Sequence, residues 1–247
     1  MKTIILAAGY ATRLYPLTEN KPKALLPIGP KPLLDHLMQK IEAIPQMDEL
    51  VLVTNDRFYK QFNDWCRTAS KKIRVQVLND GTTSNDNRLG AIGDLRFAIR
   101  SAKINDDILV LASDNLFDGS LADFVAFARK SGGAAIGTYD LGDPQLGAKK
   151  YGIIETDAQK KITRIEEKPE KPKASLVSMG IYYFPKKSLP LIDAYLQSAE
   201  KQDAPGHYAT WLLSRLDVFS YTFRGRWYDI GSFEQLEEAN RKFRGES

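Results

Sequence analysis

The sequence predicts an α/β fold in which a doubly wound, mostly parallel sheet carries an inserted lobe of antiparallel strands. Short apolar runs alternate with helical patterns through the first half of the 247 residues. From Asp140 onward, strand-like runs follow one another with only turn-like segments between them, and helical patterns return after residue 187. Alternating strands and helices indicate parallel β-α-β units, whereas strands joined by turns indicate antiparallel pairing.

The strands of the first half are short and apolar, and the helices repeat apolar residues at spacings of three and four. Parallel units of this kind bind ligands at the carboxyl ends of their strands. The run 108–112 is the most continuously apolar, so we expect it near the centre of the sheet. The predicted strands are 4–8, 50–54, 73–78, 108–112 and 134–139, and the predicted helices are 32–41, 58–66, 89–102 and 121–129.

The second half changes character twice, which suggests three segments within one domain. We expect residues 1–139 to form the α/β core, residues 140–187 the β-rich lobe, and residues 188–247 a return to the core. Ser232 is suited to cap the last helix because its hydroxyl can accept from a first-turn N–H. The predicted strands are 151–155, 162–166, 177–184, 218–223 and 227–230, and the predicted helices are 189–199, 208–216 and 233–243.

Composition excludes several classes of protein. Apolar residues make up 43% and charged residues 27% of the chain, which is ordinary for a globular protein. No apolar run approaches twenty residues and no charged-then-apolar leader is seen, so we expect no membrane span and a cytoplasmic location. The net charge of +4 is spread along the chain without a basic, aromatic-rich stripe, which argues against nucleic acid as a partner. A single cysteine excludes an intramolecular disulfide.

The loop after the first strand looks like a cradle for a triphosphate. Its small residues leave room for backbone N–H groups to converge on an anion. Arg13 then supplies a forked cation, and Lys23 supplies a point charge after Pro22. A Walker A loop is excluded because nothing after Gly9 supplies its Gly-Lys-Ser/Thr end, and Ala11 breaks the dinucleotide-binding glycine pattern.

The segment L-A-A-G-x-x-T-R-L-x-P-L-T-x-x-x-P-K, residues 6–23, resembles the N-terminal motif of the sugar-1-phosphate nucleotidyltransferases. That family, which includes the glucose-1-phosphate thymidylyl- and uridylyltransferases, has a Rossmann-like core. It usually reads G-x-G-T-R, and Ala11 stands where its second glycine would fall. If that position needs positive φ, the methyl group is expected to weaken NTP binding or to shift the loop. The resemblance implies catalytic roles for Arg13 and Lys23, and NTP binding by Leu6, Ala8, Gly9, Ala11 and Thr12.

Two carboxylates are candidates to hold Mg²⁺. Asp114 follows the predicted central strand, where a doubly wound fold places its ligands. Mg²⁺ accepts one or two carboxylates together with phosphate oxygens and water. Asp229 lies in Trp-Tyr-Asp-Ile-Gly before the last helix, and by resemblance to the family's late motif it is the second metal ligand. The family commonly has glycine before the first Asp, where this chain has Ser113.

Two further matches lie in the β-rich segment. Tyr151-Gly152 and Glu167-Lys168-Pro169 resemble the sugar-binding Y-G and E-K-P segments of the family. The resemblance implies that Glu167 accepts hydrogen bonds from sugar hydroxyls and that Lys168 pairs with the sugar phosphate, in a catalytic role. Gly152 would permit close backbone approach, and Gly180 would lie at the floor of the sugar pocket.

The base-recognition segment is the least clear match. The polar stretch 79–95 falls where the family recognises its base, and Asn79, Thr82, Asn85 and Arg88 are the candidates for NTP binding. The glutamine and proline pattern of thymidylyl- and uridylyltransferases is not seen there. The stretch also resembles relatives such as choline-phosphate cytidylyltransferase, so the base is left open.

The sequence therefore predicts Mg²⁺-dependent transfer of a nucleoside monophosphate from an NTP to a sugar 1-phosphate, with release of pyrophosphate. One alternative is a cytidylyltransferase that acts on a non-sugar phosphate such as choline phosphate. Another is a regulatory module that binds a nucleotide-sugar without catalysis. The expected partners are the NTP and the sugar 1-phosphate, and the oligomeric state, including a homo-oligomer, is left open.

Overall fold

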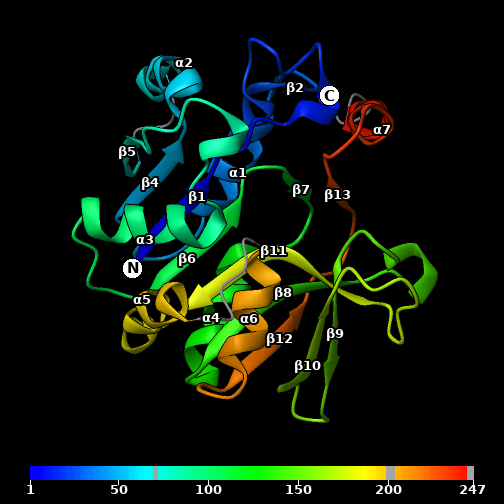
Figure 1. Cartoon of the computed structure of the whole chain (residues 1–247). Helices are drawn as coiled ribbons and strands as arrows, with labels where there is room; N and C mark the ends of the chain where they lie inside the picture. Colours follow the sequence, from blue (N-terminus) through cyan, green and yellow to red (C-terminus); the bar gives the residue numbers. More distant parts are fainter. Residues whose placement is uncertain (69–71, 199–203, 244–247) are drawn as a thin grey trace.

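The computed structural model describes residues 1–68, 72–198 and 204–243. These residues form a sheet of nine strands, flanked by helices, and two small two-stranded sheets (Figure 1). The strands are β1 Lys2–Leu6, β2 Pro27–Ile28, β3 Lys31–Pro32, β4 Glu49–Thr54, β5 Arg74–Asn79, β6 Ile108–Ala112, β7 Asn115–Phe117, β8 Ala134–Asp140, β9 Gly152–Thr156, β10 Ile162–Glu167, β11 Leu176–Phe184, β12 Val218–Thr222 and β13 Trp227–Asp229. The helices are α1 Leu33–Glu42, α2 Asp56–Thr68, α3 Ala91–Ser101, α4 Leu121–Ser131, α5 Pro190–Gln197, α6 Pro205–Leu212 and α7 Phe233–Phe243.

The main sheet confirms the predicted α/β class. Its longest path runs β10-β9-β11-β6-β1-β4-β5, in which β6 is central as expected. Neighbours among β6, β1, β4 and β5 are parallel, as are β8 and β12, whereas β11 pairs antiparallel with β6, β8 and β9. The carboxyl ends of β1 and β6 therefore lie next to each other and beside the bend of β11.

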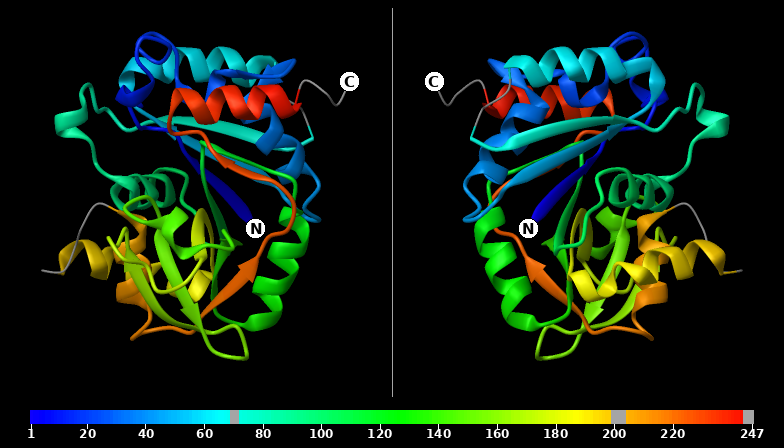
Figure 2. Two further views of the ribbon diagram at one scale, coloured as in Figure 1. Left: turned by 90° about the vertical axis from the view of Figure 1, so that its right-hand side faces the viewer. Right: turned by 90° about the vertical axis from the view of Figure 1, so that its left-hand side faces the viewer.

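Helices cover both faces of the sheet because alternate residues of the buried strands point to opposite sides. Ile5, Leu52 and Leu109 belong to an apolar cluster with α1, α2 and α4. Ile4 and Val110 belong to a cluster on the other side with α3, α5 and α6. Two views of the molecule show α7 at the same end as α2 and the β2–β3 hairpin (Figure 2). No helix among the described residues is both long and apolar enough to cross a bilayer.

The β-rich segment is continuous with the main sheet. Strands β9 and β10 extend from one end of it, and β11 passes from β9 to β6 through an irregularity between Ser178 and Ile181. Gly180 lies in this irregularity with φ 72°. One sheet thus runs through the three predicted segments, and their division stays a prediction.

Most predicted elements agree with the structure to within a few residues. The strand 108–112 and the helix 233–243 have the predicted bounds, and the Ser232 hydroxyl accepts from the Gln235 N–H at 3.3 Å. Residue 199 of the predicted helix 189–199 lies outside the described residues. The α6 helix begins at Pro205 rather than at residue 208, because proline is well suited to the first helical position.

Candidate active site

The loop after β1 has the backbone geometry of an anion site. Among the described residues, no hydrogen-bond acceptor is paired with the backbone N–H groups of residues 9–13. The carbonyl oxygens of the loop are held from the protein side. Asn55 Nδ2 donates to the oxygen of Ala8 at 2.9 Å, and Thr18 Oγ1 donates to the oxygen of Ala11 at 2.8 Å. Consecutive N–H groups that lack protein partners can bind phosphate oxygens.

Ala11 has φ 47° and ψ 42°, the left-handed conformation that glycine adopts without strain. The position at which this chain lacks the expected glycine therefore does use positive φ. The alanine adopts the conformation despite its methyl group, and a short 3₁₀ turn, Thr12–Leu14, follows it with Arg13 at its middle.

Lys23 and Asp114 form the shortest ion pair of the site. Lys23 begins a 3₁₀ turn after Pro22, and its Nζ lies 2.6 Å from Asp114 Oδ2. The two side chains are 18% and 28% exposed, so both remain accessible to a ligand. Asp114 follows the carboxyl end of β6, which is parallel to and paired with β1. The N-terminal loop and the central strand thus contribute opposite charges to one place.

A small antiparallel ribbon brings Asp229 to the same place. Strand β13 pairs with β7, and Asp229 lies opposite Asn115 in that pairing. The backbone N–H of Ile230 also donates to the carbonyl oxygen of Asp114 at 3.0 Å. Figure 1 shows β7 and β13 side by side although they are more than one hundred residues apart in the chain. The convergence of the two carboxylates that the sequence predicts is therefore present.

The electrostatics of Asp229 show which charges share the site. Burial and the Asp114 carboxylate raise the pKa of Asp229 to about 6, and the cations of Lys23, Arg13 and Lys168 act in the opposite direction. Two carboxylates that line the same cavity, one of them half-buried, form a donor pair that a divalent cation would neutralise. Among the described residues, no group of three or more His, Cys, Asp or Glu could hold a metal. A pair completed by phosphate oxygens and water is an arrangement that Mg²⁺ accepts.

A cavity of about 170 Å³ opens beside the carboxylate pair. Its walls include Asp114 and Asp229, together with Gly152, Glu167 and Lys168. Glu167 lies opposite Gly152 in the β9–β10 pairing, so the two reach the cavity from neighbouring strands. Lys168 has φ 48°, a strained conformation that directs the chain out of β10 at this point.

Gly180 forms part of the floor where β11 bends. Its φ of 72° favours glycine, and a Cβ there would lie 3.1 Å from the Cβ of Ala112. Trp227 closes another side, since its Nε1 donates to Asn115 Oδ1 at 2.8 Å and its ring lies 5.2 Å from that of Tyr151. Small residues form the floor and aromatic residues form the wall of the same cavity.

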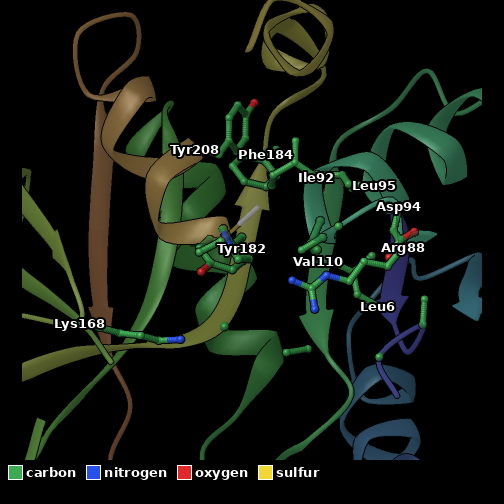
Figure 3. Close-up of a pocket in the computed structure, with 18 residues that line it drawn as sticks. Leu6, Arg88, Ile92, Asp94, Leu95, Val110, Lys168, Tyr182, Phe184 and Tyr208 are labelled. Carbon is green, nitrogen blue, oxygen red and sulfur yellow. The ribbon is translucent and has the colours of Figure 1, made fainter. Parts of the chain in front are cut away.

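A larger cavity of about 470 Å³ adjoins the first and shares Lys168 and Gly180 with it. Figure 3 shows Lys168 and Arg88 extending toward it from opposite sides. Leu6, Ala8 and Gly9 line its end near the β1 loop. A third cavity of about 140 Å³, lined by Ala11, Lys23 and Asp114 among others, continues along that loop. The three cavities thus run from the β1 loop, past Asp114, to Lys168.

The structure brings most of the predicted site residues to these cavities but leaves the middle of the base-recognition segment outside them. Arg13 and Thr12 are exposed residues of the loop and line none of the three. Asn79 Nδ2 donates to Asp56 at 2.8 Å, and the buried Thr82 hydroxyl donates to Asp80 at 2.7 Å. The Asn85 Oδ1 accepts from Arg88 Nη1 at 3.0 Å. Thr82 and Asn85 thus bond within the loop, Asn79 joins it to α2, and of these four candidates Arg88 alone lines a cavity.

Three residues of the site were not singled out by the sequence. Asn115 and Trp227 join the two carboxylate-bearing segments, and Gly206 lines the smaller cavity from the first turn of α6. Asn115 was signalled only by its position after Asp114. Gly206 gave no usable signal, because Pro-Gly at the start of a helix is an ordinary sequence.

Comparison with known proteins places this geometry in context. A family model described as "Nucleotidyl transferase" matches residues 2–246. The bifunctional protein GlmU of Methanocaldococcus jannaschii is 30% identical over 247 residues, covering 98% of this chain and 54% of that protein. A mannose-1-phosphate guanyltransferase of Debaryomyces hansenii is 31% identical over 238 residues, covering 94% of this chain and 61% of that protein. This chain therefore spans little more than half the length of these relatives.

Among solved structures, a UDP-glucose pyrophosphorylase in complex with UDP-glucose superposes with a TM-score of 0.85 at 19% identity. The match covers 100% of this chain and 99% of that one. At this identity the likeness establishes a shared fold.

Proposed function

This chain belongs to the nucleotidyl transferase family, and from that premise we propose that it transfers a nucleoside monophosphate from an NTP to a sugar 1-phosphate and releases pyrophosphate. The observation that carries the proposal is the convergence of Lys23, Asp114 and Asp229 beside two adjoining cavities. The relatives bear on the acceptor, since one is a mannose-1-phosphate guanyltransferase. The family resemblance found in the sequence is thereby confirmed, while the substrates remain part of the proposal.

The NTP would lie with its triphosphate along the β1 loop and its nucleoside in the larger cavity. The N–H groups of residues 9–13, which have no acceptor in the described part of the chain, and the guanidinium of Arg13 would hold the β- and γ-phosphates. Lys23 would neutralise charge at the α-phosphate, where the bond breaks. Arg88 would meet the base or the ribose from the cavity wall.

The acceptor would occupy the smaller cavity. Lys168 would hold its phosphate in line with the α-phosphorus, because this side chain lines both cavities. Glu167 would accept hydrogen bonds from the sugar hydroxyls, and Gly152 and Gly180 leave room for the ring. An NTP in one cavity and an acceptor phosphate in the other would meet at the shared boundary.

Asp114 and Asp229 would hold Mg²⁺, which fits the carboxylate pair for the reasons of charge and ligand number given above. When bound, the ion would neutralise phosphate charge and polarise a phosphoryl oxygen. The protein contributes the two carboxylates at fixed positions, because one follows β6 and the other lies in the ribbon that pairs with β7.

In the reaction, an anionic oxygen of the sugar phosphate attacks the α-phosphorus. A new phosphorus–oxygen bond forms as the bond to the bridging oxygen of the leaving pyrophosphate breaks, and its electron pair departs with the pyrophosphate. The nucleophile is already ionised, so the site needs no general base. Arg13, Lys23 and Lys168 would reduce repulsion between the phosphates and keep attacking and leaving oxygens in line.

The test is pyrophosphate release by the purified chain across a matrix of ATP, CTP, GTP, UTP and dTTP against several acceptors. The acceptors are glucose 1-phosphate, mannose 1-phosphate and choline phosphate, each with Mg²⁺ and with a chelator. We expect release that requires both substrates and Mg²⁺, with a sugar 1-phosphate preferred. Preference for CTP and choline phosphate would replace the sugar assignment, and absence of release with every pair would contradict catalysis and favour a regulatory binding module.

A further inference from the structure

The carboxylate of Glu167 lies in a narrow slot between two glycines from different elements. A Cβ on Gly152, its partner across the β9–β10 pairing, would lie 3.0 Å from Glu167 Oε2. A Cβ on Gly206, in the first turn of α6, would overlap Oε2 outright and lie 2.9 Å from Cδ. The carboxylate therefore occupies the volume that any side chain at position 206 would need.

This carboxylate is half-buried yet has few bonding partners. The Glu167 side chain is 14% exposed, and its one ion pair among the described residues is with Lys168 Nζ at 3.9 Å. No hydrogen bond to the Glu167 carboxylate occurs within the described part of the chain. Because burying an ionised carboxylate without donors is costly, the arrangement suits a ligand that brings its own donors. The side chain lines the acceptor cavity, where such a ligand would lie.

The α6 helix cannot readily move away from Glu167. Tyr208 and Ala209, in the turns that follow, are 1% and 2% exposed and belong to the apolar cluster under the helix. The Tyr208 ring also packs against other elements, with centroids 5.1 Å from that of Tyr195 and 5.7 Å from that of Phe184. A side chain at position 206 would therefore displace the Glu167 carboxylate rather than the helix.

We propose that Gly206 is a positioning residue for the acceptor: the absence of a side chain there creates the slot that holds the Glu167 carboxylate against the acceptor hydroxyls. The statement about the acceptor rests on the proposed function, whereas the slot itself does not. The proposal assigns part of the acceptor selectivity to α6, a helix that carries none of the site residues predicted from the sequence.

The test is a double-variant cycle of Gly206→Ala and Glu167→Ala, with thermal unfolding and steady-state kinetics measured on every member. Alanine is the better helix former, so Gly206→Ala would not weaken α6 by itself. We expect Gly206→Ala to change the unfolding temperature, because the overlap with Oε2 forces the Glu167 carboxylate out of the slot. We also expect it to raise the KM for the preferred sugar 1-phosphate by about tenfold or more, with the KM for the NTP within about twofold.

The Glu167→Ala background supplies the matched control. There, adding Gly206→Ala should leave both the unfolding temperature and the acceptor KM nearly unchanged, because no carboxylate remains to be displaced. An equal change of the unfolding temperature in both backgrounds would show that the Glu167 carboxylate does not occupy the space of a side chain at position 206. The positioning role would be contradicted if the effect of Gly206→Ala on the unfolding temperature depends on Glu167 but the acceptor KM of the active Gly206→Ala variant is unchanged. If the wild-type chain releases no pyrophosphate with any substrate pair, the proposed function and the acceptor role fail together, while the thermal cycle still decides the slot.

Discussion

Ala11 holds its left-handed backbone conformation at a cost, because a Cβ makes this region unfavourable by about 1–2 kcal/mol. Glycine would remove that cost but would lose more conformational entropy on folding, which offsets part of the gain. The expected net effect of Ala11→Gly is a rise of about 0.5–1 kcal/mol in the free energy of unfolding, measured by urea denaturation. A lower free energy of unfolding in the variant would show that the methyl group makes favourable contacts that outweigh the strain.

Asp229 has a raised pKa, and the sign of its effect on stability follows from linkage. The pKa of about 6 in the folded protein lies above the ordinary 3.8, so the folded state holds the proton more tightly. Its contribution to stability is thus favourable at low pH and is lost as the pH rises from about 4 through 6. Above that range the folded protein carries the cost of an ionised, half-buried carboxylate beside Asp114.

We therefore expect Asp229→Asn to stabilise the metal-free protein at pH 8 by about 1–3 kcal/mol, with the advantage shrinking as the pH falls toward 4. The measurement is denaturant unfolding in chelator at a series of pH values. A variant that is less stable than the wild type at pH 8 would mean that the Lys23, Arg13 and Lys168 charges outweigh burial at this site.

At the scale of elements, the β7–β13 ribbon determines where Asp229 lies. Just beyond the paired residues, the Asp118 carboxylate accepts from the Arg226 backbone N–H at 2.9 Å, from Nε at 2.9 Å and from Nη2 at 3.1 Å. These charge-assisted bonds hold the pKa of Asp118 below its usual range. They join two segments 108 residues apart in the chain, so they fix the register of the ribbon.

Removal of the Asp118–Arg226 hydrogen bonds should disturb the site although neither residue lines its cavities. We expect Asp118→Ala to lower the free energy of unfolding by about 1–2 kcal/mol and to lower kcat by about tenfold, because Asp229 loses its fixed position. The control is Asp64→Ala, which removes an exposed Asp64–Arg67 pair on α2 that should contribute little. Equal kcat values for the two variants would show that the Asp118–Arg226 bonds do not position Asp229.

The sequence predicted well those strands and helices whose apolar pattern lies within the segment itself. The run 108–112 is apolar at every position and became the central strand with unchanged bounds. The first strand was less accurate, since the apolar run 4–8 suggested its position but Lys2 and Thr3 also pair with β4 and β6. Ala7 and Ala8 belong instead to the loop, where small side chains leave the backbone N–H groups accessible to a ligand.

At the scale of the whole molecule, the site depends on contacts that no local pattern specifies. The convergence of Asp114 and Asp229 could be expected from two motifs, but the ribbon that produces it involves strands of only three residues each. The polar residues Asn79, Thr82 and Asn85 were candidates because of their type, and the structure shows the side chains of Thr82 and Asn85 bonded within the loop and that of Asn79 bonded to Asp56 of α2. Gly206 became visible only when α6 was placed against Glu167.

The central claim is that three distant segments bring Lys23, Asp114 and Asp229 to one cleft in which the phosphates react. The most direct measurement is pyrophosphate release by Asp114→Ala with the preferred substrate pair and Mg²⁺, alongside thermal unfolding of the same sample. We expect the rate to fall by about a thousandfold or more while the protein remains folded, because one of the two carboxylates that fix the cation is gone. A folded variant that releases pyrophosphate at a near-normal rate would contradict the account.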